Sequence, residues 1–163
     1  MTIVLCGFMG CGKTTVGKII AAELKMKFVD MDDYIEQKQG RKIKDIFSEN
    51  GEDFFRDIEH EACKNLADAE NTIIAAGGGA LTFKRNVDAF KNKAKIIFID
   101  TDFDTIKRRI GGDKNRPLMN DGAKELFEKR YPLYKAAADH TITAFGDVVP
   151  KEMAEKIIES YIR

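Results

Sequence analysis

A glycine-rich segment near the amino end has the residue types and spacing that hold phosphate groups. It reads Gly7-Phe8-Met9-Gly10-Cys11-Gly12-Lys13-Thr14 and fits the pattern G-x-x-x-x-G-K-[ST]. In that pattern, backbone N–H groups turn inward around phosphate oxygens, and a helix that begins there adds its positive dipole end. Lys13 can bridge the β- and γ-phosphates, and the Thr14 hydroxyl can ligate Mg²⁺. The segment predicts binding of a nucleoside triphosphate by Gly10, Cys11, Gly12, Lys13, Thr14 and Thr15.

This phosphate-binding pattern leaves the reaction open. GTPases, ATPase motors, adenylate kinases and small-molecule kinases all share it. A plain glycine-rich turn between a strand and a helix is the alternative without function. The rest of the sequence must therefore indicate which reaction the bound nucleotide undergoes.

Three aspartates follow the second apolar run, in Phe28-Val29-Asp30-Met31-Asp32-Asp33. In an open parallel sheet, the carboxyl ends of the strands carry the ligand crevice. Alternation along an extended chain places Asp30 and Asp32 on the same side, one to face a metal and the other to accept a proton from an attacking hydroxyl. The alternative is that one of the aspartates caps a helix beginning near Tyr34.

Two further segments carry residues that could contribute to the acceptor side of the site. Arg56 and Glu59 lie three apart on a predicted helix and so share a face, although a solvated ion pair is the commoner fate of that spacing. Gly77, Gly78 and Gly79 follow a predicted strand, where three glycines would weaken any regular element. They favour backbone that approaches a ligand closely or donates its N–H groups to it, and a plain loop is the alternative.

The elements that must position these residues follow from the apolar pattern. Short, mostly β-branched runs at 2–6, 27–29, 72–76, 95–100 and 140–143 predict strands. Between them, apolar residues three or four apart predict helices, as in Val16-Ile19-Ile20-Leu24. Strands that alternate with helices predict an α/β domain with helices on both faces of a parallel sheet. The chain of 163 residues suits one such domain, 1–163.

A polar stretch from Gly111 to Gly122 interrupts this alternation and includes Asn115-Arg116-Pro117-Leu118. A loop of this length in a compact domain is usually functional or disordered. Its glycines suit hinges, so residues 111–123 are predicted to form a mobile lid, with an idle surface loop as the alternative. The helix predicted after it contains Lys129-Arg130-Tyr131-Pro132-Leu133-Tyr134.

The composition narrows the classes of partner. The 27 basic residues balance the 27 acidic ones, so no global field attracts nucleic acid or an anionic membrane. We find no secretory leader and no apolar run long enough to span a bilayer. Three cysteines without C-x-x-C spacing, Cys6, Cys11 and Cys63, suit a reducing cytoplasm rather than a disulfide framework or a zinc site. We therefore expect a cytoplasmic protein that acts on a small molecule. We also expect a monomer, because no long apolar stripe is left over once the core is assigned.

Taken together, the motifs resemble those of the shikimate kinases over nearly the whole chain, from Thr2 to about Arg163. The correspondences are the phosphate-binding loop, an F-x-D-x-D segment, an F-R-x-x-E helix, a G-G-G turn, an R-P-L lid and an R-x-P-L-Y helix, in that order. The resemblance implies a three-layer α/β/α P-loop fold with a central five-stranded parallel sheet. It also implies a small helical substrate-binding subdomain at about residues 31–60, a lid, and ATP-dependent phosphorylation of the 3-hydroxyl of shikimate.

The resemblance implies roles on the acceptor side. Asp32 would bind the ring hydroxyls of shikimate and act as the base. Arg56 and Arg130 would bind the substrate carboxylate, for which a planar guanidinium is well shaped. The residues expected to assist are Gly78 and Gly79 through backbone N–H groups, Glu59 by holding Arg56, and Ile43, Phe47 and Phe55 as the apolar wall.

On the nucleotide side, the resemblance implies that Lys13 and Arg116 are catalytic, with Arg116 reaching the γ-phosphate from the lid. Arg109 would lie against the adenine, and Thr14 with Asp30 would hold Mg²⁺, Asp30 through the ion's water shell. The turn Thr143-Ala144-Phe145-Gly146-Asp147 departs from relatives that carry basic residues beside adenine, which weakens any assignment of adenine contacts there.

Three other functions stay open at this point. A gluconate-type kinase also binds a carboxylate beside hydroxyls. A nucleoside monophosphate kinase would need a base-stacking arrangement that the Asp32 segment lacks. A catalytically silent ATP-binding module would need the phosphate-binding loop but not Asp32, Arg56, Arg116 and Arg130 together.

Overall fold

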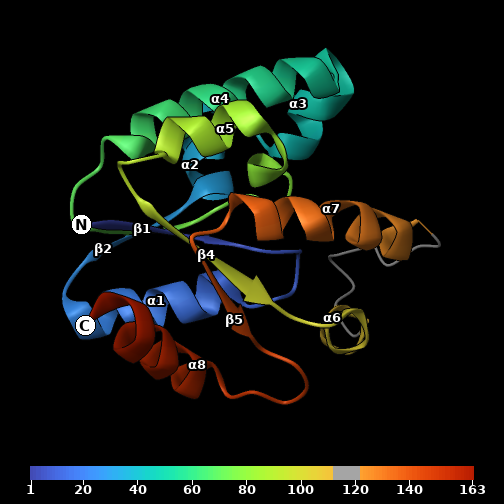
Figure 1. The fold of residues 1–163 in the computed structure, drawn as a ribbon. Helices are drawn as coiled ribbons and strands as arrows, with labels where there is room; N and C mark the ends of the chain where they lie inside the picture. Colours follow the sequence, from blue (N-terminus) through green and yellow to red (C-terminus); the bar gives the residue numbers. More distant parts are fainter. Residues whose placement is uncertain (112–121) are drawn as a thin grey trace.

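The computed structural model describes residues 1–111 and 122–163 as an α/β/α sandwich (Figure 1). All five strands are parallel, in the order β2-β3-β1-β4-β5. The strands are β1 Thr2–Cys6, β2 Lys27–Asp30, β3 Thr72–Ala75, β4 Lys95–Asp100 and β5 His140–Thr143. The helices are α1 Lys13–Leu24, α2 Met31–Gln39, α3 Ile43–Asn50, α4 Glu52–Ala67, α5 Lys84–Phe90, α6 Phe103–Ile110, α7 Ala123–Ala137 and α8 Pro150–Ile157. A short 3₁₀ turn, Ala80–Thr82, precedes α5, and a π-helical turn, Ile158–Ile162, follows α8.

Two cores form because successive residues of a strand point to opposite faces of the sheet. In β1, Val4 and Cys6 pack into the core beneath α4, α5 and α7, whereas Ile3 and Leu5 pack into the core over α1 and α8. Figure 1 shows these two groups of helices on opposite faces of the sheet. The predicted three-layer fold and its five-stranded parallel sheet are thus confirmed.

The strand order places the phosphate-binding loop and the glycine turn side by side. β1 pairs with β3, so the segments that follow these strands leave the same edge of the sheet. The chain after β1 continues into α1 on one face, whereas the chain after β3 continues toward α5 on the other (Figure 1). Diverging connections at the carboxyl ends of neighbouring parallel strands leave room for a ligand between them.

The second strand and the helix after it differ from the sequence prediction. β2 extends to Asp30, and α2 begins at Met31 rather than near Tyr34. The cause is a helix cap: Asp30 Oδ1 accepts hydrogen bonds from the backbone N–H groups of Asp32 (3.0 Å) and Asp33 (3.2 Å). Asp32 is therefore helical, and the prediction that alternation along an extended segment orients it with Asp30 was wrong.

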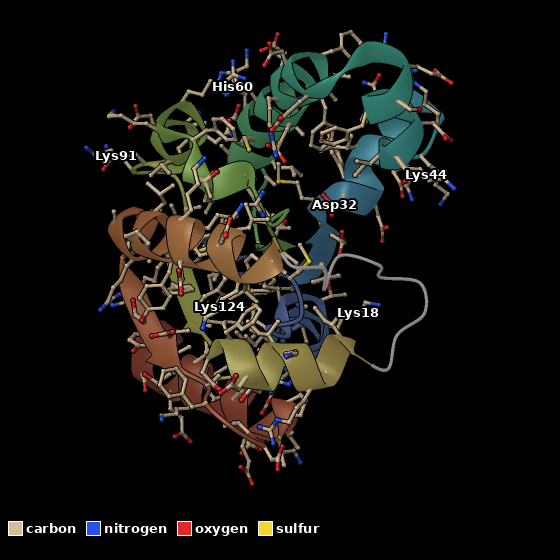
Figure 2. The ribbon with its side chains drawn as sticks, turned by 90° about the vertical axis from the view of Figure 1, so that its right-hand side faces the viewer. Lys18, Asp32, Lys44, His60, Lys91 and Lys124 are labelled. Atoms are coloured by element: carbon tan, nitrogen blue, oxygen red, sulfur yellow. The ribbon has the colours of Figure 1, made fainter. Side chains whose placement is uncertain are left out.

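The helices α2, α3 and α4 form a compact unit beside the sheet, within which the predicted substrate-binding subdomain falls. Figure 2 shows Asp32 at the start of α2, with α3 and α4 on one side and α6 and α7 on the other. Of the predicted lid, residues 112–121, including Arg116, lie outside the described residues. No helix within 1–111 and 122–163 combines the length and apolar character that a bilayer crossing requires.

Candidate active site

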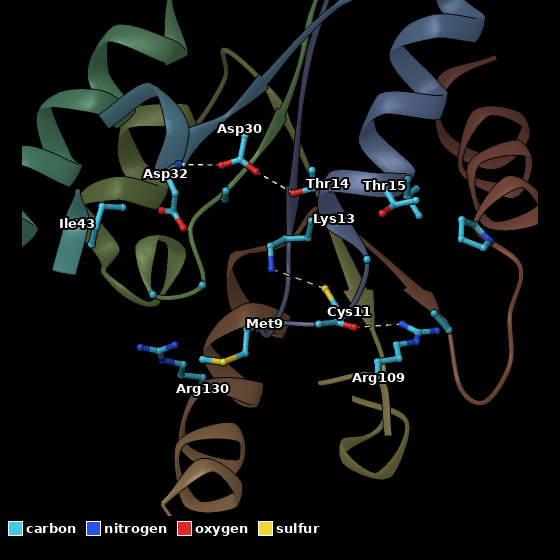
Figure 3. A pocket seen from close by; sticks show the side chains of 18 of the residues that line it. Met9, Cys11, Lys13, Thr14, Thr15, Asp30, Asp32, Ile43, Arg109 and Arg130 are labelled. Carbon is cyan, nitrogen blue, oxygen red and sulfur yellow. Dashed lines mark hydrogen bonds between the residues drawn. The ribbon is translucent and has the colours of Figure 1, made fainter. Parts of the chain in front are cut away.

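A cavity of about 700 Å³ runs along the carboxyl edge of the sheet. The phosphate-binding loop forms its middle, and two carboxylates and two guanidinium groups line one end. Figure 3 shows Lys13, Asp32 and Arg130 pointing into the same open space. Its walls are formed by Met9–Val16, Asp30, Asp32, Ile43, Phe47, Phe55, Arg56, Glu59, Ala76, Gly78, Gly79, Arg109, Arg130, Ala144, Val148, Pro150 and Met153.

Two glycines give the phosphate-binding loop its shape. Gly10 and Gly12 have φ values of 80° and 100°, which side-chain-bearing residues rarely adopt. A Cβ at Gly10 would also lie 2.6 Å from Ile110 Cδ1. Gly12 precedes the first residue of α1, so the backbone N–H groups at the start of that helix face the cavity. The loop therefore provides the donors that a triphosphate requires.

Lys13 places its ammonium group inside this loop. Its Nζ donates to the carbonyl oxygens of Gly7 (2.6 Å) and Phe8 (3.2 Å) and lies 3.8 Å from Cys11 Sγ. On the other side of the loop, Arg109 Nη1 donates to the Gly10 carbonyl at 3.2 Å. Two cations thus border the space that phosphate groups would enter.

Thr14 and Asp30 bring two oxygen ligands together at the start of α1. Thr14 Oγ1 donates to Asp30 Oδ2 at 2.8 Å, while the other carboxylate oxygen caps α2 (Figure 3). A hydroxyl next to a carboxylate suits Mg²⁺, which prefers oxygen ligands and keeps several waters. Within the described part of the chain, no cluster of three or more His, Cys, Asp or Glu side chains could hold a metal. The residues present fit an ion held mainly by phosphates and water.

Asp32 presents a carboxylate whose charge is disfavoured by its surroundings. Burial raises its pKa, the neighbouring Asp30 carboxylate raises it further, and the Lys13 ammonium opposes the shift. Its Oδ1 lies 2.8 Å from the position that a Cβ would take at Gly77. A carboxylate with a raised pKa inside a cavity is a good candidate for a proton acceptor.

Arg56 and Glu59 form a buried ion pair, which corrects the expectation that a solvated pair is the commoner fate of their spacing. Glu59 is 1% exposed, the Arg56 side chain is 13% exposed, and Nη1 lies 2.9 Å from Oε1. Burial raises the pKa of Glu59, and Arg56 opposes that shift. The pair lies on the face of α4 that packs toward the glycine turn, so Arg56 is held in one orientation.

The three glycines make room for the charged side chains that converge on them. A Cβ at Gly79 would lie 2.7 Å from Arg56 Nη1 and 3.1 Å from Arg130 Nη2. A Cβ at Gly78 would lie 3.6 Å from Arg130 Nη1. None of the three glycines has a positive φ. Gly77 and Gly79 are required here because neighbouring side chains leave little room for a Cβ atom, and not because of an unusual backbone conformation. Two guanidinium groups from α4 and α7 therefore meet at one turn of backbone.

With this geometry established, similarity to known proteins identifies the family. A family model described as shikimate kinase matches residues 9–162. The chain belongs to the shikimate kinase family. A curated shikimate kinase of Persephonella marina is 43% identical over 88% of this chain and 89% of its own length. One from Clostridium botulinum, strain Eklund 17B, is 42% identical over 94% and 93%.

Solved structures of shikimate kinases share the fold. The enzyme from Acinetobacter baumannii, solved in complex with shikimate, has a TM-score of 0.89 and 33% identity, covering 99% of this chain and 95% of its own. The Aquifex aeolicus shikimate kinase has a TM-score of 0.87 and 35% identity, with 98% and 95% covered. The predicted family is thus confirmed.

The structure places nearly all the residues that the shikimate kinase resemblance singled out around this one cavity. Arg116 is the exception, because it lies outside the described residues. The apolar wall also lines the cavity: Ile43 and Phe47 come from α3 and Phe55 from α4, with the Phe47 and Phe55 ring centroids 4.7 Å apart.

Sequence reasoning assigned no role to four apolar residues that line the cavity, although one of them lies in the turn 143–147 that it discussed. Ala144, Val148, Pro150 and Met153 line the cavity beside Arg109. They come from the turn after β5 and from α8, and nothing in their types suggests a ligand. Tyr134 was also missed: its hydroxyl donates to the carbonyl oxygen of Gly78. The R-x-P-L-Y motif contained this residue but did not indicate what it contacts.

Proposed function

We propose that this member of the shikimate kinase family transfers the γ-phosphoryl group of ATP to the 3-hydroxyl of shikimate, giving 3-phosphoshikimate and ADP. The observation that carries the proposal is the meeting of Arg56 and Arg130 at Gly79, in the same cavity as Asp32 and the phosphate-binding loop. A carboxylate between two guanidinium groups would leave the ring hydroxyls of the acceptor near Asp32.

The residues at the end of the cavity that would bind shikimate orient it for the reaction. Two planar guanidinium groups can each bind carboxylate oxygens through paired N–H donors. The backbone N–H groups of Gly78 and Gly79 would add donors beside them. Phe47, Phe55 and Ile43 would contact the apolar side of the ring. Such a fixed pose converts a reaction between two molecules into one that needs little further ordering.

Asp32 would accept the proton of the 3-hydroxyl as the oxygen–phosphorus bond forms and the bond to the β-phosphate oxygen breaks. Its raised pKa favours this role because a carboxylate with a higher pKa is a stronger proton acceptor. Lys13 would oppose the charge on the β- and γ-phosphate oxygens, and Arg116 would do so from the lid. Thr14 and Asp30 would hold Mg²⁺, which when bound neutralises further phosphate charge.

Release of ADP with different acceptors tests this function directly. With Mg·ATP, we expect turnover with shikimate and only background release with gluconate, nucleoside monophosphates or no acceptor. Turnover with gluconate but not shikimate would reassign the enzyme to the gluconate-type kinases. ATP binding without turnover on any acceptor would favour the silent regulatory module.

We further propose that the enzyme works as a monomer in the cytoplasm. The three cysteines are free and buried, which suits a reducing cytoplasm. Among the described residues, exposed large apolar side chains such as Phe54, Leu133 and Phe145 belong to separate segments, which favours a monomer. Sedimentation equilibrium at micromolar concentration tests the oligomeric state, because a dimer would give about twice the molar mass of the monomer.

A further inference from the structure

Tyr134 connects the helix that carries Arg130 to the glycine turn. It is 1% exposed, and its ring packs against Phe98 with centroids 5.5 Å apart. Its hydroxyl donates to the carbonyl oxygen of Gly78, 56 residues away in the chain. Tyr134 follows Arg130 by four residues on α7, so both side chains leave the same face of the helix. One helix face thus presents both a guanidinium and a phenol to the turn.

The bond from Tyr134 orients a peptide plane at the cavity wall. In a trans peptide, the C=O of one residue and the N–H of the next point in opposite directions. The described peptide bonds are all trans, so a Gly78 carbonyl held toward α7 directs the Gly79 N–H away from Tyr134. Within residues 1–111 and 122–163, that N–H has no acceptor. It lies at the residue where the Arg56 and Arg130 guanidinium groups converge.

Pro132 makes this link more important for the position of Arg130. It lies inside α7, between Arg130 and Tyr134. Proline has no N–H, so one helical hydrogen bond is missing in this turn, and prolines in helices favour bending there. The helix backbone alone therefore constrains the angle of this turn less than usual. The hydrogen bond from Tyr134, which follows Pro132 in α7, therefore fixes this part of the helix to the glycine turn.

We propose that Tyr134 is a positioning residue for the acceptor carboxylate: its hydroxyl holds the Gly78 carbonyl, which aims the Gly79 N–H and sets the Arg130 guanidinium at the same point. The inference rests on the proposed function, in which the carboxylate lies between Arg56 and Arg130. Tyr134 itself touches no substrate in this arrangement.

Replacement of the phenol by phenyl tests this role. In Tyr134→Phe, we expect KM for shikimate to rise about 10-fold, the loss typical of one well-placed hydrogen bond, with KM for ATP within about 2-fold of the parent value. The matched control is Tyr131→Phe. Tyr131 lies on the same helix, but its hydroxyl donates to Asp100 Oδ2 at 2.8 Å, away from the glycine turn. Its loss is expected to leave KM for shikimate unchanged.

Comparison with an uncharged acceptor distinguishes a loss of carboxylate positioning in Tyr134→Phe from a general packing defect. Shikimate methyl ester lacks the anionic carboxylate, so the preference of the enzyme for shikimate over the ester should shrink in Tyr134→Phe and persist in Tyr131→Phe. An unchanged preference in Tyr134→Phe would overturn the proposal. If Arg130→Ala also left the preference for shikimate over the ester unchanged, the proposed carboxylate site would be wrong. If Arg130→Ala reduced the preference and Tyr134→Phe did not, only the proposed role of Tyr134 would be wrong.

A measurement on the unaltered enzyme applies even if Tyr134→Phe does not fold. The Gly79 amide proton is observed by NMR during titration with shikimate and with the methyl ester. We expect a downfield shift with shikimate, as for an N–H that gains a charged acceptor, and a smaller one with the ester. The absence of any difference between the two ligands would contradict the proposal.

Discussion

The guanidinium of Arg56 lies 2.9 Å from the carboxylate of Glu59, which is buried, and the Arg56 side chain itself is mostly buried. A buried charge that loses its partner is costly, whereas an exposed pair contributes little. The pair therefore orients Arg56 toward the glycine turn and makes that orientation depend on Glu59.

Glu59→Gln is expected to raise KM for shikimate about 10-fold and to leave KM for ATP nearly unchanged, since the amide no longer balances the charge of Arg56. Glu59→Ala should also lower the free energy of unfolding by about 3 kcal/mol, because Arg56 is left buried without its main partner. Steady-state kinetics and urea denaturation measure the two effects. Asp57→Asn is the control: Asp57 pairs with Arg85 on the exposed side of α4, and neither quantity should change.

Asp32→Asn is expected to keep ATP affinity and to reduce kcat by roughly 10²–10⁴-fold, the usual contribution of a positioned base. ATP binding by calorimetry and turnover by ADP release give the two values. Near-normal turnover in this variant would remove Asp32 from the role of base.

The pH dependence of Asp32 should affect activity and stability in opposite ways. Because the pKa of Asp32 is raised in the folded protein, activity should fall as pH drops through that raised pKa. This acid limb of the kcat/KM profile should be missing in Asp32→Asn. The anion destabilises the fold above that pKa, so Asp32→Asn should raise Tm at pH 7, and its advantage should shrink toward acid pH. An equal change in Tm at pH 4 and pH 7 would contradict this linkage.

Gly79→Ala is expected to raise KM for shikimate by at least about 10-fold, since the new Cβ would displace the ends of Arg56 and Arg130. The displaced atoms belong to flexible side chains rather than backbone, so Tm should change little. Gly78→Ala is the matched comparison, because its Cβ would meet Arg130 only at an ordinary contact distance of 3.6 Å. Equal effects of the two substitutions would show that crowding of the guanidinium groups is not the cause.

Asp30 can be tested for its two contacts separately. Asp30→Asn keeps an oxygen that can cap α2 but loses the charge beside Thr14, whereas Asp30→Ala loses both. We expect the Mg²⁺ concentration for half-maximal activity to rise about 10-fold in both variants. Only Asp30→Ala should lower the free energy of unfolding, by about 1 kcal/mol, the usual value of a helix cap. A normal Mg²⁺ requirement in both would restrict Asp30 to capping.

Some features were predictable because they depend on residues that are close in the chain. The phosphate-binding loop is one turn of backbone, and its glycines, Lys13 and Thr14 act on the same ligand wherever the rest of the chain goes. Strand alternation was predictable for the same reason, and three of the five predicted strands have the observed bounds. The start of α2 was missed because a side-chain cap at Asp30, rather than apolar periodicity, decides it.

The amino-acid sequence by itself therefore determined the α/β class and the nucleotide loop, and through its resemblance to a family it indicated the acceptor. Only the tertiary structure decided that Glu59 is buried, that the pKa of Asp32 is raised, and that Arg56, Arg130 and Tyr134 meet at Gly78 and Gly79. The physical reason is that solvation and convergence depend on how α4 and α7 pack around the turn after β3. Gly79 in that turn lies 23 residues after Arg56 and 51 residues before Arg130. The spacing of residues in the sequence determines which side chains share a helix face. Only the packing of the helices determines which residues that face contacts.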